Sequence, residues 1–184
     1  TRDYLGMIDP LDGTTNFAHG FPYFSVSLGL MKGDDVVLGV VYNPMTDECF
    51  VAERGGGSFL NGQRVAVSTQ ATLQESLLTT GFPYDIATTT KDNMKSFALA
   101  SKVSQGVRCL GSAALDLCQV ASGRLEAFWE RSLQPWDIAA GSLIVEEAGG
   151  QVTGCGGQTF SAMGHEVCAT NSLIHDDLVK LLTE

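Results

Sequence analysis

Positive charge is scarce in this sequence. Its 184 residues include 11 Lys and Arg against 21 Asp and Glu, which gives a formal net charge of −10 at pH 7. The acidic residues are spread along the chain and no basic stripe interrupts them, so nucleic acid is not expected as a partner. If the ligand is nevertheless a phosphate, a bound metal ion must separate it from the carboxylates, because like charges in a cleft repel.

Paired cysteines and long apolar runs are also lacking. The five cysteines are odd in number and widely spaced without a C-x-x-C pair, which predicts neither a disulfide framework nor a zinc site. We expect them to be small buried residues. No apolar run is long enough to span a bilayer, so we expect a soluble, cytoplasmic protein with no membrane partner. The length and the 44% hydrophobic content fit one globular domain over residues 1–184.

The first half of the chain predicts a series of short strands. Apolar runs bounded by turn residues lie at Tyr4 to Ile8, Phe24 to Met31, Val36 to Tyr42, Glu48 to Glu53 and Ser58 to Leu60. The second half predicts helices at Lys91 to Ser104, from Ser112 to Gly123, at Ile138 to Ala148 and at Ile174 to Leu182, with one strand at Leu125 to Trp129. The sequence therefore predicts an α+β fold.

The stretch DPLDGTTNF, residues 9–17, carries the most chemical information. Asp9 and Asp12 lie three residues apart across a turn that proline makes rigid, and the Leu11 carbonyl lies between them. These hard oxygen ligands suit Mg²⁺, Mn²⁺ or Ca²⁺, and a phosphate substrate favours Mg²⁺, which readily shares its shell with phosphate oxygens. Gly13 permits close approach of the backbone to a ligand, and the backbone amides of Gly13, Thr14 and Thr15 suit an anion. The alternative is a plain surface turn, because Asp, Pro and Gly are common turn residues.

A second motif, QPWDIAAG at residues 134–141, opens an apolar helix that EEAGG closes at residues 146–150. Asp137 stands where an N-cap residue belongs, so its role is either to cap its own helix or to hold a cation. A helix this apolar is buried, and a carboxylate at its buried end needs a partner such as a metal ion. Both roles are compatible.

Together, the DPLDGTTNF, WDIAAG and EEAGG motifs resemble the paired signature of the inositol monophosphatase family, lithium-sensitive, metal-dependent sugar phosphatases related to fructose-1,6-bisphosphatase. The likeness extends in order over essentially the whole chain. It implies the layered α/β sugar-phosphatase fold and hydrolysis of a small phosphate monoester, with inositol monophosphate as the leading substrate. It also implies two or three Mg²⁺ ions in the complete enzyme and a possible homodimer.

The resemblance assigns roles to matching positions. The Mg²⁺ ions would be held by Asp9, the Leu11 carbonyl, Asp12 and Asp137. Gly13 and Thr14 would bind phosphate, with the Thr14 hydroxyl also orienting the attacking water. The positions that family members use against sugar or inositol hydroxyls correspond here to Gly111, Ser112, Ala113 and Glu130. The alternative for Glu130 is an exposed surface charge, the common case for glutamate.

One departure from the family pattern concerns the start of the chain. In the family, a helical segment that precedes the first motif supplies a Glu to the metal site. Here eight residues precede Asp9, and Asp3 is the lone carboxylate among them. We therefore expect a chain that lacks the N-terminal helical segment and binds the catalytic metal pair poorly.

Two competing hypotheses remain open at this point. Related phosphatases act on fructose bisphosphate, NADP, histidinol phosphate or 3′-phosphonucleotides, and the shared motifs do not separate these substrates. A non-catalytic protein, either truncated or a dimerising binding protein that retains the fold, is the alternative of a different class. The intact motifs argue against it, because their groups are useful mainly for catalysis.

Overall fold

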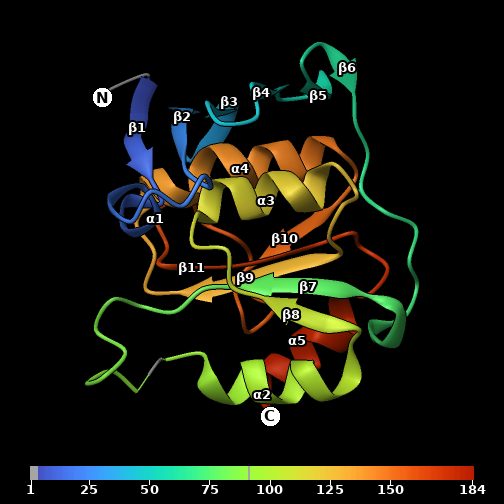
Figure 1. Ribbon diagram of the computed structural model, residues 1–184. Helices are drawn as coiled ribbons and strands as arrows, with labels where there is room; N and C mark the ends of the chain where they lie inside the picture. Colours follow the sequence, from blue (N-terminus) through green and yellow to red (C-terminus); the bar gives the residue numbers. More distant parts are fainter. Residues whose placement is uncertain (1–3, 91) are drawn as a thin grey trace.

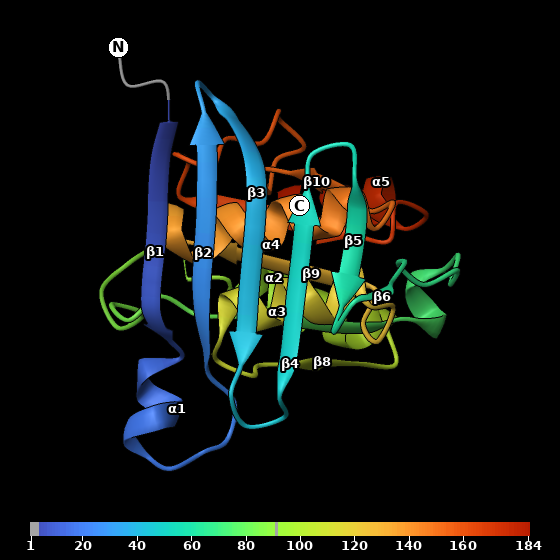
Figure 2. The same cartoon turned by 90° about the horizontal axis from the view of Figure 1, so that it is seen from above.

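A computed structural model describes residues 4–90 and 92–184. Its first sheet is antiparallel throughout and follows chain order: β1 (Tyr4–Asp12), β2 (Ser25–Lys32), β3 (Asp35–Asn43), β4 (Glu48–Glu53), β5 (Gly57–Leu60) and β6 (Gln63–Arg64). The short helix α1 (Thr14–Ala18) follows β1. The series of strands predicted for the first half is therefore confirmed, and it forms one sheet (Figure 2).

The second sheet is mixed and built from short strands. Its order is β10 (Gln151–Thr153), β11 (Glu166–Thr170), β9 (Ala127–Arg131), β7 (Leu77–Thr80) and β8 (Gly106–Arg108). Strand β7 pairs in parallel with both β8 and β9, while β9, β11 and β10 pair antiparallel. Of these strands the sequence predicted only β9, and two residues too early.

The helices form two further layers. Helices α3 (Ala113–Ala121) and α4 (Pro135–Glu147) lie between the sheets, and α2 (Met94–Val103) and α5 (His175–Thr183) cover the far side of the second sheet (Figure 1). A 3₁₀ turn, η1 (Leu73–Glu75), precedes β7. The predicted α+β layered fold is confirmed. The expected start of α2 at Lys91 lies outside the described residues, and the helix itself begins at Met94.

Helix α4 packs closely against the first sheet through small residues. A Cβ atom added to Gly39 of β3 would lie 2.6 Å from the Ala140 carbonyl oxygen, and one on Gly29 of β2 would lie 3.0 Å from Ala139 Cβ. Larger residues at these positions would push the helix away, because protein interiors have little free space. The apolar residues of α4 from Ile138 to Val145 are buried, as the sequence predicted.

One sequence expectation, the burial of all five cysteines, needs correction. In the part of the chain that the structure describes, all five cysteines are free thiols, but Cys109 is exposed and Cys49 half-buried, so only Cys118, Cys155 and Cys168 are buried as expected. None of the helices within the described ranges has the length and apolar character needed to cross a bilayer.

Candidate metal and phosphate site

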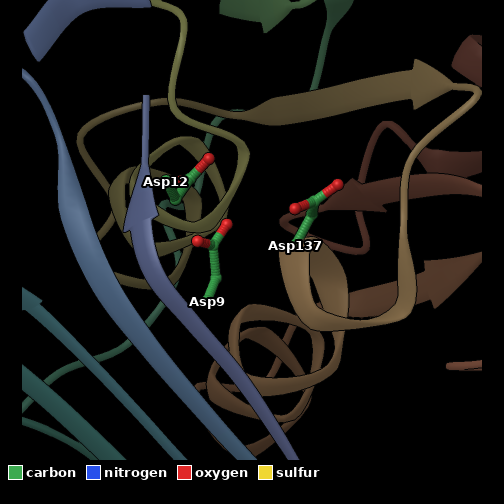
Figure 3. Close-up of side chains that lie close together, drawn as sticks. All are labelled: Asp9, Asp12 and Asp137. Carbon is green, nitrogen blue, oxygen red and sulfur yellow. The ribbon is translucent and has the colours of Figure 1, made fainter. Parts of the chain in front are cut away.

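Three carboxylates converge where β1 ends and α4 begins. One oxygen from each of Asp9, Asp12 and Asp137 lies within 4.8 Å of the others (Figure 3). Asp9 and Asp12 come from the end of β1, and Asp137 comes from the first turn of α4. Residues 125 positions apart in the sequence are thus brought to one point by the packing of this helix on the first sheet.

The end of β1 is shaped to present both of its carboxylates. Its pairing with β2 is regular as far as Asp9 and shifts register before Asp12. Within this irregular segment the Leu11 amide donates a hydrogen bond of 3.0 Å to Asp9 Oδ1, which fixes the Asp9 side chain against its own turn. Asp9 and Asp12 can therefore face the same point even though they are an odd number of residues apart along a strand.

Asp12 is held from behind by the start of α3. Its Oδ2 atom accepts hydrogen bonds from Ser112 Oγ at 2.5 Å and from the Ala114 amide at 2.9 Å. The pKa of Asp12 is nevertheless raised to about 6, because burial and, to a smaller extent, the nearby charge of Asp9 outweigh the lowering effect of these two hydrogen bonds. The Asp12 carboxylate is thus held in one orientation, and none of the ion pairs among residues 4–90 and 92–184 involves it.

Asp137 is not the N-cap that the sequence suggested. Helix α4 begins at Pro135, so Gln134 is the N-cap and Asp137 is the third helical residue. Its Oδ2 atom accepts a hydrogen bond of 2.7 Å from the Gln134 amide, the reach-back bond of a capping box. The start was misplaced because proline is well tolerated in the first turn. The pKa of Asp137 is raised to about 7, mainly by burial and also by the charges of Asp12 and Asp9, although the Gln134 hydrogen bond lowers it.

The turn after Asp12 places the predicted phosphate-binding residues beside the carboxylates. Gly13 has a φ of +87°, a conformation that glycine adopts without strain. The Thr14 hydroxyl donates a hydrogen bond of 2.9 Å to the Leu11 carbonyl. This carbonyl oxygen has a second lone pair for another partner. The four residues from Leu11 to Thr14 line the same cavity as Asp9.

Asn16 anchors this turn, a role that the sequence reasoning missed. Its Nδ2 group donates hydrogen bonds of 2.7 Å to the carbonyl oxygens of both Tyr23 and Leu110. Asn16 thereby ties the turn to the segment before α3. The position of Asn16 within the DPLDGTTNF motif indicated that it belongs to the site. Its hydrogen-bond partners lie 7 and 94 residues away, and the sequence pattern does not predict such distant contacts.

Glu130 lies at the end of β9, half-buried. Its carboxylate lies against Gly81, where any side chain would overlap it. Burial raises the pKa of Glu130 well above its usual value, and the charges of Asp116, Asp12 and Asp137 raise it further. The alternative of an exposed surface charge is therefore wrong.

All but one of the predicted site residues line a cavity of about 470 Å³. The exception is Ser112, which is 1% exposed and holds Asp12 from behind. Thr15, whose amide the sequence also indicated, lines the cavity as well. The cavity includes further residues that the sequence reasoning did not select: Asn16, Gly81, Phe82, Pro83, Tyr84, Ser132, Leu133, Gln134 and Trp136. Gln134 and Trp136 belong to the second motif, but the Gly81 to Tyr84 segment carries no signal except its turn residues.

The oxygen atoms of this site fit a hard divalent cation. Three carboxylates meet with no Lys, Arg or His among the described residues that line the cavity. Their mutual repulsion and burial raise the pKa of Asp12 and Asp137, so the deprotonated forms need a positive charge between them. Carboxylate and carbonyl oxygens are the ligands that Mg²⁺, Mn²⁺ and Ca²⁺ prefer.

Comparison with known proteins agrees with this geometry. The family model described as "Inositol monophosphatase family" matches residues 1–184. An inositol-1-monophosphatase of Synechocystis is 48% identical over 97% of this chain, which spans 62% of that relative's length. A fructose-1,6-bisphosphatase/inositol-1-monophosphatase of Thermotoga maritima is 43% identical over 99% of the chain, which spans 69% of that protein.

Solved structures show the same likeness. The structure of an inositol monophosphatase from Anabaena superimposes with a TM-score of 0.97 at 44% identity, covering 99% of this chain and 72% of the other. The match of the family model to the whole chain, the sequence identities and this superposition all lead to one conclusion. The chain belongs to the inositol monophosphatase family.

Proposed function

We propose that this site hydrolyses a small phosphate monoester, with inositol monophosphate as the leading substrate and Mg²⁺ as the metal. The observation that carries the proposal is the convergence of Asp9, Asp12 and Asp137 beside the Gly13–Thr14 turn, in a cavity large enough for a small phosphorylated polyol. The names of the Synechocystis and Thermotoga relatives support the reaction class.

The protein residues would hold the ions and the ester in a fixed arrangement. The ions would be bound by Asp9, the Leu11 carbonyl, Asp12 and Asp137. We expect two or three ions in the complete enzyme. When bound, divalent ions neutralise phosphoryl charge and favour the departing alkoxide. Because Ser112 and the Ala114 amide hold Asp12, and the Gln134 amide holds Asp137, these carboxylates are oriented before any ligand arrives.

The neighbouring turn would handle the phosphate and the water. We propose that the Gly13 and Thr14 amides bind phosphoryl oxygens and that the exposed Thr14 hydroxyl orients the attacking water. Gly111, Ala113 and Glu130 line the same cavity, which supports the proposal that they contact the leaving group's hydroxyls. Ser112 would contribute by holding Asp12 rather than by touching the polyol. A direct attack by water needs no covalent enzyme intermediate.

A panel assay of phosphate release tests the proposal. The chain, and the full-length product of the coding sequence that contains it, are supplied with inositol 1-phosphate, fructose 1,6-bisphosphate, histidinol phosphate, NADP and p-nitrophenyl phosphate, with and without Mg²⁺. We expect Mg²⁺-dependent release that is fastest from inositol 1-phosphate in the full-length product. If neither protein releases phosphate from any of these esters, the site has a non-catalytic role. Homodimerisation and a cytoplasmic location stay predictions.

A further inference from the structure

A fourth carboxylate lies behind the cavity and takes no part in the roles described above. Asp116, in α3, is 1% exposed and uses both of its oxygens as acceptors. Tyr23 donates its phenolic hydrogen to Oδ1 at 2.8 Å, and Thr79 donates its hydroxyl hydrogen to Oδ2 at 3.2 Å. These donors come from the segment between α1 and β2 and from β7, so one carboxyl joins the loop that leads into the first sheet to a strand of the second sheet.

Tyr23 connects Asp116 to the phosphate-binding turn. The Tyr23 carbonyl accepts the Asn16 amide hydrogen bond and would lie 3.0 Å from a Cβ atom on Gly13. The Tyr23 backbone therefore forms the wall directly behind the turn. Because the Tyr23 phenol is hydrogen-bonded to Asp116 in the buried helix α3, the Tyr23 backbone is held in place behind the turn.

Thr79 connects Asp116 to the other part of the cavity. It lies in β7, two residues before Gly81, whose backbone lies against the Glu130 carboxylate. Thr80, between them, donates a hydrogen bond of 2.5 Å to the Trp129 carbonyl, next to Glu130. A shift of β7 would thus displace the surface where Gly81 and Glu130 meet.

We propose that Asp116 is a positioning residue that sets the separation between the phosphate-binding turn and the Glu130 surface. This inference rests on the proposed phosphatase function. Its two hydrogen bonds fix the turn through Tyr23 and the Glu130 surface through Thr79, so the phosphoryl group and the leaving group are held at one spacing. A misplacement of about 1 Å can reduce a reaction rate on the order of a hundredfold, so this spacing matters for turnover.

The test removes single hydroxyl groups without changing side-chain shape. Tyr23→Phe deletes only the bond to Asp116. Its matched control is Tyr42→Phe, which deletes the Tyr42 bond to Asp47, of 2.9 Å, on an exposed part of the first sheet. We expect Tyr23→Phe to lower kcat/KM about tenfold for both inositol 1-phosphate and p-nitrophenyl phosphate. It should also speed amide hydrogen exchange over residues 13–21, and Tyr42→Phe should do neither.

Substitutions of Asp116 itself give a second comparison. Asp116→Asn keeps an acceptor for Tyr23 and gives Thr79 a donor, and Thr79 can still donate to the Arg108 carbonyl, 3.2 Å away. It should retain most of the activity. Asp116→Leu removes both bonds and should lose at least as much kcat/KM as Tyr23→Phe.

The proposed function and this inference can fail separately. If the wild-type protein hydrolyses no ester, the phosphatase proposal fails, and the hydrogen exchange of residues 13–21 still tests the role of Asp116. Unchanged exchange in Tyr23→Phe would overturn the inference. So would an Asp116→Leu protein that loses thermal stability but keeps wild-type kcat/KM, because Asp116 would then only stabilise the fold.

Discussion

The two walls of the cavity are built in different ways. The acidic wall, which consists of Asp9, Asp12 and Asp137, stands on the end of a strand and on two buried helices, and backbone amides hold each carboxylate. The loop wall, which consists of Phe82, Pro83 and Tyr84, follows β7. Phe82 packs edge-on against Phe97 at 5.7 Å between ring centres, whereas Tyr84 is 89% exposed.

If the site hydrolyses phosphate esters as proposed, the acidic wall carries out the reaction and the loop wall affects which ester binds. Residues of the acidic wall cannot move without disturbing the core, so their substitution should affect every phosphate ester alike. The tip of the loop wall touches little else, so a change there should affect only how tightly a particular ester binds. The predictions below test this division, beginning with the largest effect.

Asp137→Asn should break the acidic wall. The asparagine keeps an acceptor for the Gln134 amide, so the helix start should survive, but one of the three converging charges is lost. We expect kcat to fall about a thousandfold or more for all esters, because charge stabilisation by the ion is worth several kcal/mol. Mg²⁺ should also no longer raise the melting temperature. Asp34→Asn, at an exposed hairpin, is the control, and an equal Mg²⁺ response in both variants would contradict a metal role for Asp137.

Gly39→Ala should disturb the acidic wall from a distance. Its new methyl group would lie 2.6 Å from the Ala140 carbonyl oxygen, so α4 must move away from the sheet. We expect the free energy of unfolding to fall by about 1–3 kcal/mol and the apparent Mg²⁺ affinity to weaken. Gly6→Ala in β1, where no atom lies within 4 Å of the added carbon, is the matched control. Equal denaturation midpoints for the two variants would show that the close packing is not needed.

The acidic wall should also make the metal-free protein less stable at higher pH. The pKa of Asp137 rises from 3.8 to about 7 on folding, and that of Asp12 to about 6. At pH values between the unfolded pKa of 3.8 and these folded pKa values, the folded state binds more protons than the unfolded state. The free energy of unfolding therefore falls as the pH rises through this range. In EDTA, the melting temperature of the wild type relative to Asp137→Asn should fall by a few degrees from pH 5 to pH 8. A constant difference would mean that Asp137 titrates normally.

Tyr84→Ala should have the smallest effect. The side chain is almost fully exposed, so the melting temperature and kcat should stay unchanged. The KM for inositol 1-phosphate should change by no more than about threefold, an effect of the size expected for one partly exposed contact. Steady-state kinetics on two esters would detect it. A large fall in kcat would place Tyr84 in the chemistry and remove the distinction between the two walls.

The sequence predicted the acidic wall better than the loop wall, for physical reasons. Asp9 and Asp12 share one turn, and the apolar helix after Asp137 indicated a buried end for that residue. By contrast, the Ser112 bond to Asp12 joins residues 100 positions apart, and only the packing of α3 brings them together. The sequence therefore indicated the converging carboxylates but not what holds them in place.

The second sheet was largely missed because its strands give weak patterns. Strands β7, β8 and β10 have three or four residues each, too few to show alternation of apolar and polar side chains. In β11, Val167, Cys168 and Ala169 are all buried, so both faces are covered and no alternation exists. The loop wall and Gly81 depend on this sheet, and they were missed with it.

The burial of α4 makes the metal site sensitive to the whole interior. This helix contacts β1 to β5 in one sheet and β10 and β11 in the other, and it carries Asp137 in its first turn. A change in the spacing of the sheets must therefore shift Asp137 relative to Asp9. A substitution at the fully buried Ile144, which lies about 10 Å from Asp137 along the helix axis, would therefore change the geometry of the site. If the site binds metal as proposed, a metal titration would therefore also detect changes in core packing.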